Sequence, residues 1–177
     1  IPLPAVEAEA IGSIRHLNAD ETVDGILLLS PLSPGLSLAA LAAVLDPAKD
    51  VDGLTADNAG RLARGAAGLF PCTPQAAILL AEESLGSLRG LRATVVGASA
   101  GVGRPLAELL LQRGATVTIA HADTRDLAAA CRSAEILFVA VGKAGLITAA
   151  HVAPGSTVID IGINAVDDGA GGKAIVG

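Results

Sequence analysis

Two kinds of apolar pattern open the chain. Between residues 5 and 17, apolar side chains recur every three or four positions, which predicts an amphipathic helix that ends near Asn18. Residues 23–29 are almost continuously apolar, which is typical of a strand buried on both faces. This strand leads into a proline-rich loop at 30–35. Because ligands bind beyond the carboxyl ends of strands in open parallel sheets, that loop is a candidate wall of a binding site.

A short helix and a charged loop are predicted next. Ser37 is placed to cap a helix that runs through Leu45. The loop 49–54 then combines three charged side chains with a glycine. Two interpretations stay open for this loop: an ordinary solvated turn, or one wall of a polar site that continues through Arg61.

A loss of apolar pattern predicts the boundary between two domains. Thr73 as the N-cap and Pro74 as the first helical residue predict another helix. Residues 85–91 then interrupt the pattern with polar side chains and two glycines. We therefore expect one domain at 1–85 and a second at 86–177.

From residue 91 onward, apolar runs and helical spacing alternate. The expected strands are 93–96, 115–120, 136–141 and 157–161. Helices are expected between them, one of them capped by Thr124, and a short one at 148–152. This alternation predicts an α/β fold with a doubly wound parallel sheet and right-handed crossovers.

The turn after the first of these strands has the character of a phosphate cradle. Gly97, Gly101 and Gly103 follow the strand, and helical spacing begins at Leu106. A backbone can approach an anion closely where no Cβ intervenes, and a helix N-terminus offers unpaired N–H groups. Because the spacing is not the common Gly-x-Gly-x-x-Gly, a tight turn without a ligand stays the alternative on this stretch alone.

The residues after the second strand bear on the choice of cofactor, because this position meets the adenosine ribose in dinucleotide-binding sheets. A carboxylate there accepts hydrogen bonds from the ribose hydroxyls and repels a 2′-phosphate, so Asp123 favours NAD. Arg104 and Arg125 lie close in sequence and weaken that argument. A simple role for Asp123 at the start of a helix is equally open.

Composition narrows the classes of function. The net charge is −6, with 12 basic and 18 acidic residues and only two aromatic ones, which argues against nucleic-acid binding. No apolar run reaches the roughly 18 residues of a membrane span, so we expect a soluble, cytoplasmic protein. Cys72, Cys131 and the three histidines show no metal-ligand spacing, so no metal site is expected. Methionine is absent even at position 1, so we expect residues before Ile1.

Six ordered motifs together resemble one known family. They are Val-Asp-Gly-Ile-Leu at 23–27, Lys-Asp-Val-Asp-Gly at 49–53, Pro-Cys-Thr-Pro at 71–74, Val-Gly-Ala-Ser at 96–99 with Val-Gly-Arg-Pro at 102–105, Ala-Val-Gly-Lys at 140–143, and Val-Ile-Asp-Ile-Gly-Ile-Asn at 158–164. In this order and over the whole chain, they resemble the bifunctional methylenetetrahydrofolate dehydrogenase/methenyltetrahydrofolate cyclohydrolase family.

The resemblance implies a homodimer of two-domain subunits. A catalytic α/β domain, whose N-terminal part would precede Ile1, joins a Rossmann-like dinucleotide-binding domain. Such enzymes oxidise 5,10-methylenetetrahydrofolate with NADP, or less often with NAD. They then hydrolyse the methenyl product to 10-formyltetrahydrofolate, in one-carbon metabolism and purine biosynthesis.

The resemblance also assigns residues to the site. Asp52 matches the family's catalytic aspartate, which holds the pterin, and a carboxylate can accept two parallel hydrogen bonds from adjacent N–H donors. The substrate wall that it implies consists of Pro71, Cys72, Thr73 and Pro74. The cofactor-binding residues that it implies are Gly97, Ala98, Ser99, Gly101, Gly103, Ala122 and Ile163.

Two positions depart from the family pattern. Leu29 stands where members carry a glutamine that assists a lysine, which belongs to a Tyr-x-x-x-Lys motif upstream of Ile1. An apolar side chain cannot hydrogen-bond a lysine, so hydrolysis is the step expected to slow most. Ala122 stands where members carry a Ser or Arg that meets the 2′-phosphate, which weakens the case for NADP.

Three other functions therefore stay open beside the bifunctional enzyme. The first is a dehydrogenase with an impaired cyclohydrolase, and the second is a non-catalytic folate- or nucleotide-binding paralogue. The third is a nicotinamide-dependent dehydrogenase for another substrate, although the motifs at 49–53 and 71–74 would then need a separate explanation.

Overall fold

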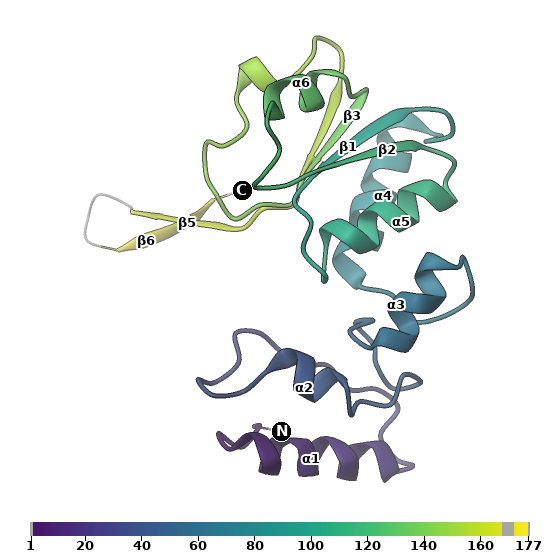
Figure 1. Cartoon of the computed structure of the whole chain (residues 1–177), viewed down its shortest axis with the longest axis vertical. Coiled ribbons are helices and arrows are strands. Elements are labelled where there is room, and N and C mark those ends of the chain that lie inside the picture. The colour runs from purple at the N-terminus through teal and green to yellow at the C-terminus, as the bar shows by residue number, and fades with distance from the viewer. Residues whose placement is uncertain (1, 168–171, 177) are drawn as a thin grey trace. The chain divides into compact units, whose positions relative to one another are not determined.

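The chain divides into two compact units, Ile1–Pro71 and Cys72–Gly177, in a computed structural model that describes residues 2–167 and 172–176 (Figure 1). The division precedes the boundary that we predicted at 85–91. The reason is that α4 (Cys72–Leu85) packs against α5 (Gly103–Gln112) of the second unit. An ion pair between Arg113 Nε and Glu82 Oε1, at 2.9 Å, strengthens that contact.

The first unit contains three helices. They are α1 (Glu7–Ala19), α2 (Leu38–Ala42) and α3 (Ala56–Ala63). The predicted amphipathic helix is confirmed by α1, and Ser37 caps α2 as predicted, since its hydroxyl accepts a hydrogen bond from Ala40 N at 3.3 Å. The core of the unit is formed by Ala10, Ile14, Ile26, Leu28, Leu41 and Leu45.

Lys49 closes the C-terminal end of α1. Its Nζ donates to the carbonyl oxygens of Leu17, Asn18 and Asp20 at 3.0, 2.8 and 2.7 Å. The last carbonyls of a helix have no partner within it, and a cation is favourable at the negative end of the helix dipole. The charged loop is thereby anchored to the first helix.

The segment 23–29 is extended, but the prediction of a strand buried on both faces is wrong. Ile26 forms a single parallel bridge with Asp50. Ile26 and Leu28 are buried, whereas Leu27 is 52% and Leu29 73% exposed. Since only alternate side chains meet the core of the described unit, the apolar run overstated the burial of this segment.

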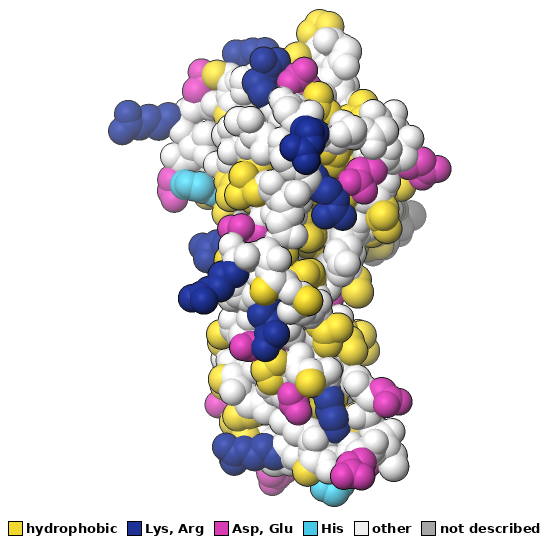
Figure 2. Space-filling model, turned by 90° about the vertical axis from the view of Figure 1, so that its right-hand side faces the viewer, with side chains coloured by type: hydrophobic (Ala, Val, Ile, Leu, Met, Phe, Trp, Pro, Cys, Tyr) yellow, Lys and Arg dark blue, Asp and Glu magenta, His cyan; other side chains and the backbone are white. Residues whose placement is uncertain are grey.

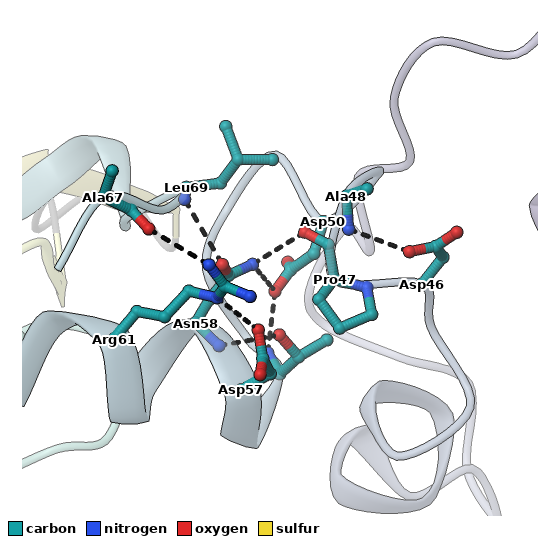
Figure 3. A network of polar contacts seen from close by, with 10 residues as sticks. Asp46, Pro47, Ala48, Asp50, Asp57, Asn58, Arg61, Ala67 and Leu69 are labelled. Carbon is teal, nitrogen blue, oxygen red and sulfur yellow. Dashed lines mark hydrogen bonds and ion pairs between the residues drawn. The ribbon is translucent and has the colours of Figure 1, made fainter.

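The buried carboxylate of Asp50 organises the charged loop (Figure 3). Its Oδ1 accepts from Leu54 N at 3.0 Å, and its Oδ2 accepts from Thr55 N at 2.8 Å and from Asn58 Nδ2 at 3.1 Å. Asn58 Nδ2 also donates to Pro47 O at 2.9 Å. Burial raises the pKa of Asp50, but these hydrogen bonds to the charged form outweigh it, so the pKa lies below its usual 3.8.

The second unit confirms the predicted α/β fold with a parallel sheet. Its strands are β1 (Arg92–Val96), β2 (Thr116–Ala120), β3 (Ile136–Val139) and β4 (Thr157–Asp160). They lie in the order β2-β1-β3-β4, and all three pairings are parallel. The two central strands, β1 and β3, are buried along nearly their whole length, which explains their continuous apolar sequence.

Helices cover both faces of this sheet. Figure 1 shows α4 and α5 on one side and α6 (Leu127–Arg132) on the other. The prediction that Thr124 caps this helix is wrong: Asp126 is the cap, and its carboxylate accepts from Ala129 N at 2.8 Å. The hydroxyl of Thr124 accepts instead from His121 N at 2.9 Å, within the turn that precedes the helix.

Two further elements complete the second unit. The predicted short helix near 148–152 is a 3₁₀ turn, η1 (Ala149–His151), with Thr148 as its N-cap. An antiparallel pair, β5 (Asn164–Asp167) and β6 (Lys173–Val176), follows the parallel sheet. The sequence analysis did not predict this pair.

The surface carries charges of both signs. On the face shown in Figure 2, Lys and Arg side chains are interspersed with acidic ones. Across residues 2–167 and 172–176, none of the helices combines the length and apolarity needed to cross a bilayer.

We expect Asp50→Asn to lower the free energy of unfolding by about 2–4 kcal/mol at pH 7, because an amide offers one acceptor to three N–H donors. The folded-state pKa of Asp50 is depressed, so its carboxylate contributes stability above the unfolded pKa and loses it as pH falls through the folded pKa. The variant should therefore lose less stability than the wild type between pH 5 and pH 2. Denaturant unfolding at several pH values measures both effects.

Asp57→Asn is the matched control, since Asp57 is half-exposed and pairs with Arg61 on the same helix. It should change the stability by less than about 0.5 kcal/mol. An Asp50→Asn protein as stable as this control would contradict the role assigned to Asp50.

Candidate functional site

The turn after β1 is so tight that a side chain cannot fit at Gly103, the first residue of α5. A Cβ on Gly103 would lie 1.9 Å from the carbonyl oxygen of Gly97. Gly97 has a φ of 116°, and a Cβ there would lie 2.4 Å from Ala140 O. At Gly101, by contrast, a Cβ would have no neighbour within 4 Å. The close contact sets the N-terminus of α5 against the carboxyl end of β1.

Ser99 shapes this turn from within. Its hydroxyl oxygen accepts hydrogen bonds from Val102 N at 3.2 Å and from Gly103 N at 3.3 Å. Its carbonyl oxygen accepts from Arg104 N at 3.1 Å. Since the hydroxyl oxygen accepts in both side-chain bonds, the hydroxyl hydrogen can still be donated to a ligand.

A pocket of about 550 Å³ lies at the carboxyl ends of β1, β2 and β3. Of the predicted cofactor residues, Gly97, Ala98, Ser99 and Ala122 line it. Gly101, Gly103 and Ile163 are not part of its lining, although Gly103 shapes the turn that forms one wall. The pocket is therefore centred where the sequence analysis placed the adenosine end of a dinucleotide.

The pocket wall formed by the residues after β3 was not predicted from the sequence. Ala140, Val141 and Lys143 come directly after this strand and line the pocket, together with Leu127 and Leu146. The rule that ligands bind beyond the carboxyl ends of parallel strands was the signal that could have identified them.

Asp123 does not line the pocket. Its side chain is 93% exposed, and its backbone N–H donates to His121 Nδ1 at 3.2 Å. Since Nδ1 accepts this bond, the donor that the ring offers is Nε2–H. His121 and Thr124 therefore supply the polar groups on the β2 side of the pocket.

After β4, the exposed Ile163 is followed by the buried Asn164. Ile161 N donates to Val139 O at 2.8 Å, which continues the pairing of β4 with β3. Ile163 is 76% exposed. Asn164 is 7% exposed, and its Oδ1 has no hydrogen-bond partner among the described residues. A buried amide oxygen without a donor is unfavourable, so this atom suits an N–H group from a ligand.

In the first unit, Asp52 is partly exposed and lies in the turn just after the buried Asp50. A Cβ on Gly53, whose φ is 62°, would lie 2.8 Å from Pro71 Cδ, so this turn packs directly against Pro71. Parallel bridging of Ile26 with Asp50 also means that Leu29 and Asp52 both lie on the carboxyl side of the bridge. Two of the predicted substrate residues, Asp52 and Pro71, are thus neighbours.

The remaining predicted substrate residues begin α4. The helix starts at Cys72, so Thr73 lies in its first turn and not at the predicted N-cap. Cys72 and Thr73 are exposed, whereas Pro71 and Pro74 are buried. Only the first two of these four side chains are therefore accessible at the surface.

Within the described part of the chain, no cluster of three or more His, Cys, Asp or Glu side chains could hold a metal ion.

Two family models match the chain. One describes the NAD(P)-binding domain of tetrahydrofolate dehydrogenase/cyclohydrolase and matches residues 71–177. The other describes the catalytic domain of the same family and matches residues 1–52. The first match begins at the division between the two compact units.

Curated relatives agree with these matches. The chain is 50% identical to the bifunctional protein FolD of Rhodopseudomonas palustris (strain TIE-1) over 98% of its own length and 59% of that protein. It is 47% identical to FolD of Nitrobacter winogradskyi over its full length and 60% of that protein.

Solved structures are similar as well. The bifunctional FolD methylenetetrahydrofolate dehydrogenase/cyclohydrolase of Campylobacter jejuni matches with a TM-score of 0.88 and 35% identity, over 96% of this chain and 60% of that one. The Trypanosoma brucei FolD, complexed with NADP cofactor and inhibitor, matches with a TM-score of 0.87 and 33% identity, over 99% and 62%. The chain thus spans about 60% of the length of these relatives.

We expect Gly103→Ala to abolish the ordered turn, because its Cβ would overlap the carbonyl oxygen of Gly97. The free energy of unfolding should fall by more than about 2 kcal/mol, and dinucleotide binding should be lost with it. Gly101→Ala adds the same methyl group into open space and should stay within about 0.5 kcal/mol of the wild type. Thermal unfolding and a dinucleotide titration of both variants test this contrast, and equal behaviour would refute it.

Proposed function

Because the chain belongs to the tetrahydrofolate dehydrogenase/cyclohydrolase family, we propose that the protein oxidises 5,10-methylenetetrahydrofolate with NADP and hydrolyses the methenyl product to 10-formyltetrahydrofolate. The observation that carries the proposal is the pocket at the carboxyl ends of β1, β2 and β3, within the residues that match the NAD(P)-binding domain. The family and the resemblance further support a cytoplasmic homodimer that supplies one-carbon units, including those for purine biosynthesis.

The residues of the second unit fit a nicotinamide dinucleotide. Leu127, Val141 and Leu146 supply apolar walls for an adenine ring, and the Ser99 turn at the N-terminus of α5 suits phosphate oxygens. The unpartnered Oδ1 of Asn164, next to Ile163, suits the N–H donors of a carboxamide. When bound, the cofactor supplies the two-electron oxidation, while the protein supplies binding and orientation.

The residues of the first unit fit the pterin end of a folate. Asp52 is partly exposed, and the Asp50 network fixes the loop that carries it. A carboxylate on a fixed loop can accept two parallel hydrogen bonds from the amide and amino edge of the pterin. Oxidation then requires only that the folate methylene be held against the nicotinamide, so positioning is the main task of these residues.

A second function is favoured by Leu29, namely a dehydrogenase with slow hydrolysis. The hydrolytic step needs a base or a polarised water, and a leucine supplies neither a donor nor an acceptor. Leu29 is 73% exposed, on the same side of the Ile26–Asp50 bridge as Asp52. Its side chain is therefore open to solvent near the proposed pterin-binding loop.

We expect the protein, expressed from its natural reading frame, to convert methylenetetrahydrofolate and NADP to the methenyl chromophore, as followed by absorbance. Asp52→Ala should lower kcat/KM at least about 100-fold, because the pterin loses its anchor. NADP binding should be unchanged. Asp57→Ala removes an exposed carboxylate elsewhere in the first unit and should keep full activity. Absence of turnover with both NADP and NAD would overturn the proposed function.

We also expect Leu29→Gln to raise the rate of methenyltetrahydrofolate hydrolysis at least about tenfold, because an amide can orient a neighbouring base or water. The dehydrogenase rate should change less than about twofold. Leu27→Gln is the matched control: Leu27 is likewise an exposed leucine of this segment, but it does not occupy the family's glutamine position. An unchanged hydrolysis rate for Leu29→Gln would show that this position does not limit the second step.

A further inference from the structure

The dinucleotide pocket has an unusual balance of charge. Of the described residues that line it, Lys143 is the only lysine or arginine, and His121 is the only histidine. No carboxylate belongs to that lining, since Asp123 points to solvent with 93% of its side chain exposed. The pocket therefore lacks the acidic group that accepts from the 2′-hydroxyl of NAD and repels a 2′-phosphate.

The residues that line the β2 side of the pocket include no lysine or arginine. Ala122 offers neither a charge nor a hydrogen-bond donor there. His121 Nδ1 accepts from Asp123 N, so Nε2–H is the donor that this ring offers. Thr124 accepts from His121 N through its hydroxyl oxygen, so its hydroxyl hydrogen can be donated. This side can thus hydrogen-bond a phosphate oxygen, but its lining contributes no lysine or arginine to pair with the phosphate.

Lys143 reaches the same pocket from the other side. It follows β3, and the sheet order places β1 alone between β3 and β2. The carboxyl ends of β2 and β3 are therefore two strand spacings apart, which is about 10 Å. A lysine side chain together with a bound phosphate can bridge that distance, and Lys143 is exposed at the rim, where nothing in the described structure binds its ammonium group.

We propose that Lys143 binds the 2′-phosphate of NADP and replaces, from the loop after β3, the side chain that Ala122 lacks after β2. The inference rests on the proposed function only in that the ligand is a nicotinamide dinucleotide. A lysine forms charge-assisted hydrogen bonds with a phosphate, and the donors of His121 and Thr124 complete its surroundings. The protein is therefore selective for NADP despite its alanine at position 122.

The test is a binding titration of the purified protein with two pairs of ligands, NADP with NAD and 2′,5′-ADP with 5′-AMP. Each pair differs in the 2′-phosphate. The wild type should bind the phosphorylated member of each pair more tightly. Lys143→Gln should weaken that member at least about tenfold and should change the other less than twofold.

Two variants serve as controls. Arg89→Gln makes the same change of charge just before β1, at the opposite end of the sheet from the pocket, and should leave all four affinities unchanged. Ala122→Arg, added to Lys143→Gln, should restore NADP binding to within a few-fold of the wild type. That rescue would not occur if Lys143→Gln had disrupted folding.

The outcomes separate this inference from the proposed function. An equal loss for both members of each pair, or no loss at all, would overturn the role of Lys143 even in an active enzyme. A selective loss in a protein that turns over no folate would support Lys143 while refuting the proposed activity.

Discussion

The contact between Gly103 and the carbonyl of Gly97 is the constraint on which the second unit depends. It brings the first turn of α5 onto the end of β1, at a separation that excludes any side chain. Ser99 then satisfies the N–H groups that this arrangement leaves at the start of the helix. Gly97 in turn lies against Ala140, so the loop after β3 is held at the same place. The pocket exists because these backbone segments meet without a Cβ between them.

Two aspartates of the charged loop, Asp50 and Asp52, have different surroundings. Asp50 is buried, and backbone and side-chain N–H donors satisfy its carboxylate. Asp52, two residues later, remains partly exposed on the loop that Asp50 holds. Lys49 anchors the same loop to α1. Lys49 and Asp50 thus hold the charged loop in place, and Asp52 is the carboxylate of this loop that we propose for pterin recognition.

The departures from the family pattern act on different steps. In the proposed function, oxidation needs the two ligands to be held in place, and both units supply residues proposed for that task. Hydrolysis needs proton transfer, which an apolar Leu29 cannot assist. Cofactor selectivity depends on a positive charge near the ribose. That charge can come from the residues after β2 or from the residues after β3. A replacement at one position therefore weakens one step without removing the site.

The central strands and the glycine turn followed directly from the sequence. Residues on β1 and β3 are buried on both faces, so their apolar runs predicted them correctly. The same pattern gave a wrong prediction at 23–29. An apolar run shows the type of the side chains but not how many strands pair with the segment, and Ile26 forms only an isolated bridge with Asp50. The predicted cap of α6 was also wrong, because the backbone path places Asp126 and not Thr124 at the N-cap.

The motif order alone was enough to identify the family, and it supplied the proposals for the pterin aspartate and the dinucleotide turn, because those residues are close in sequence to the elements that position them. Tertiary structure decided what lies opposite them. Lys143 shares a pocket with Ala122 only because β3 crosses back beside β1, and Asp50 is distinguished from Asp52 only by burial. Contacts between distant segments depend on strand order and packing, which no local pattern of residues encodes.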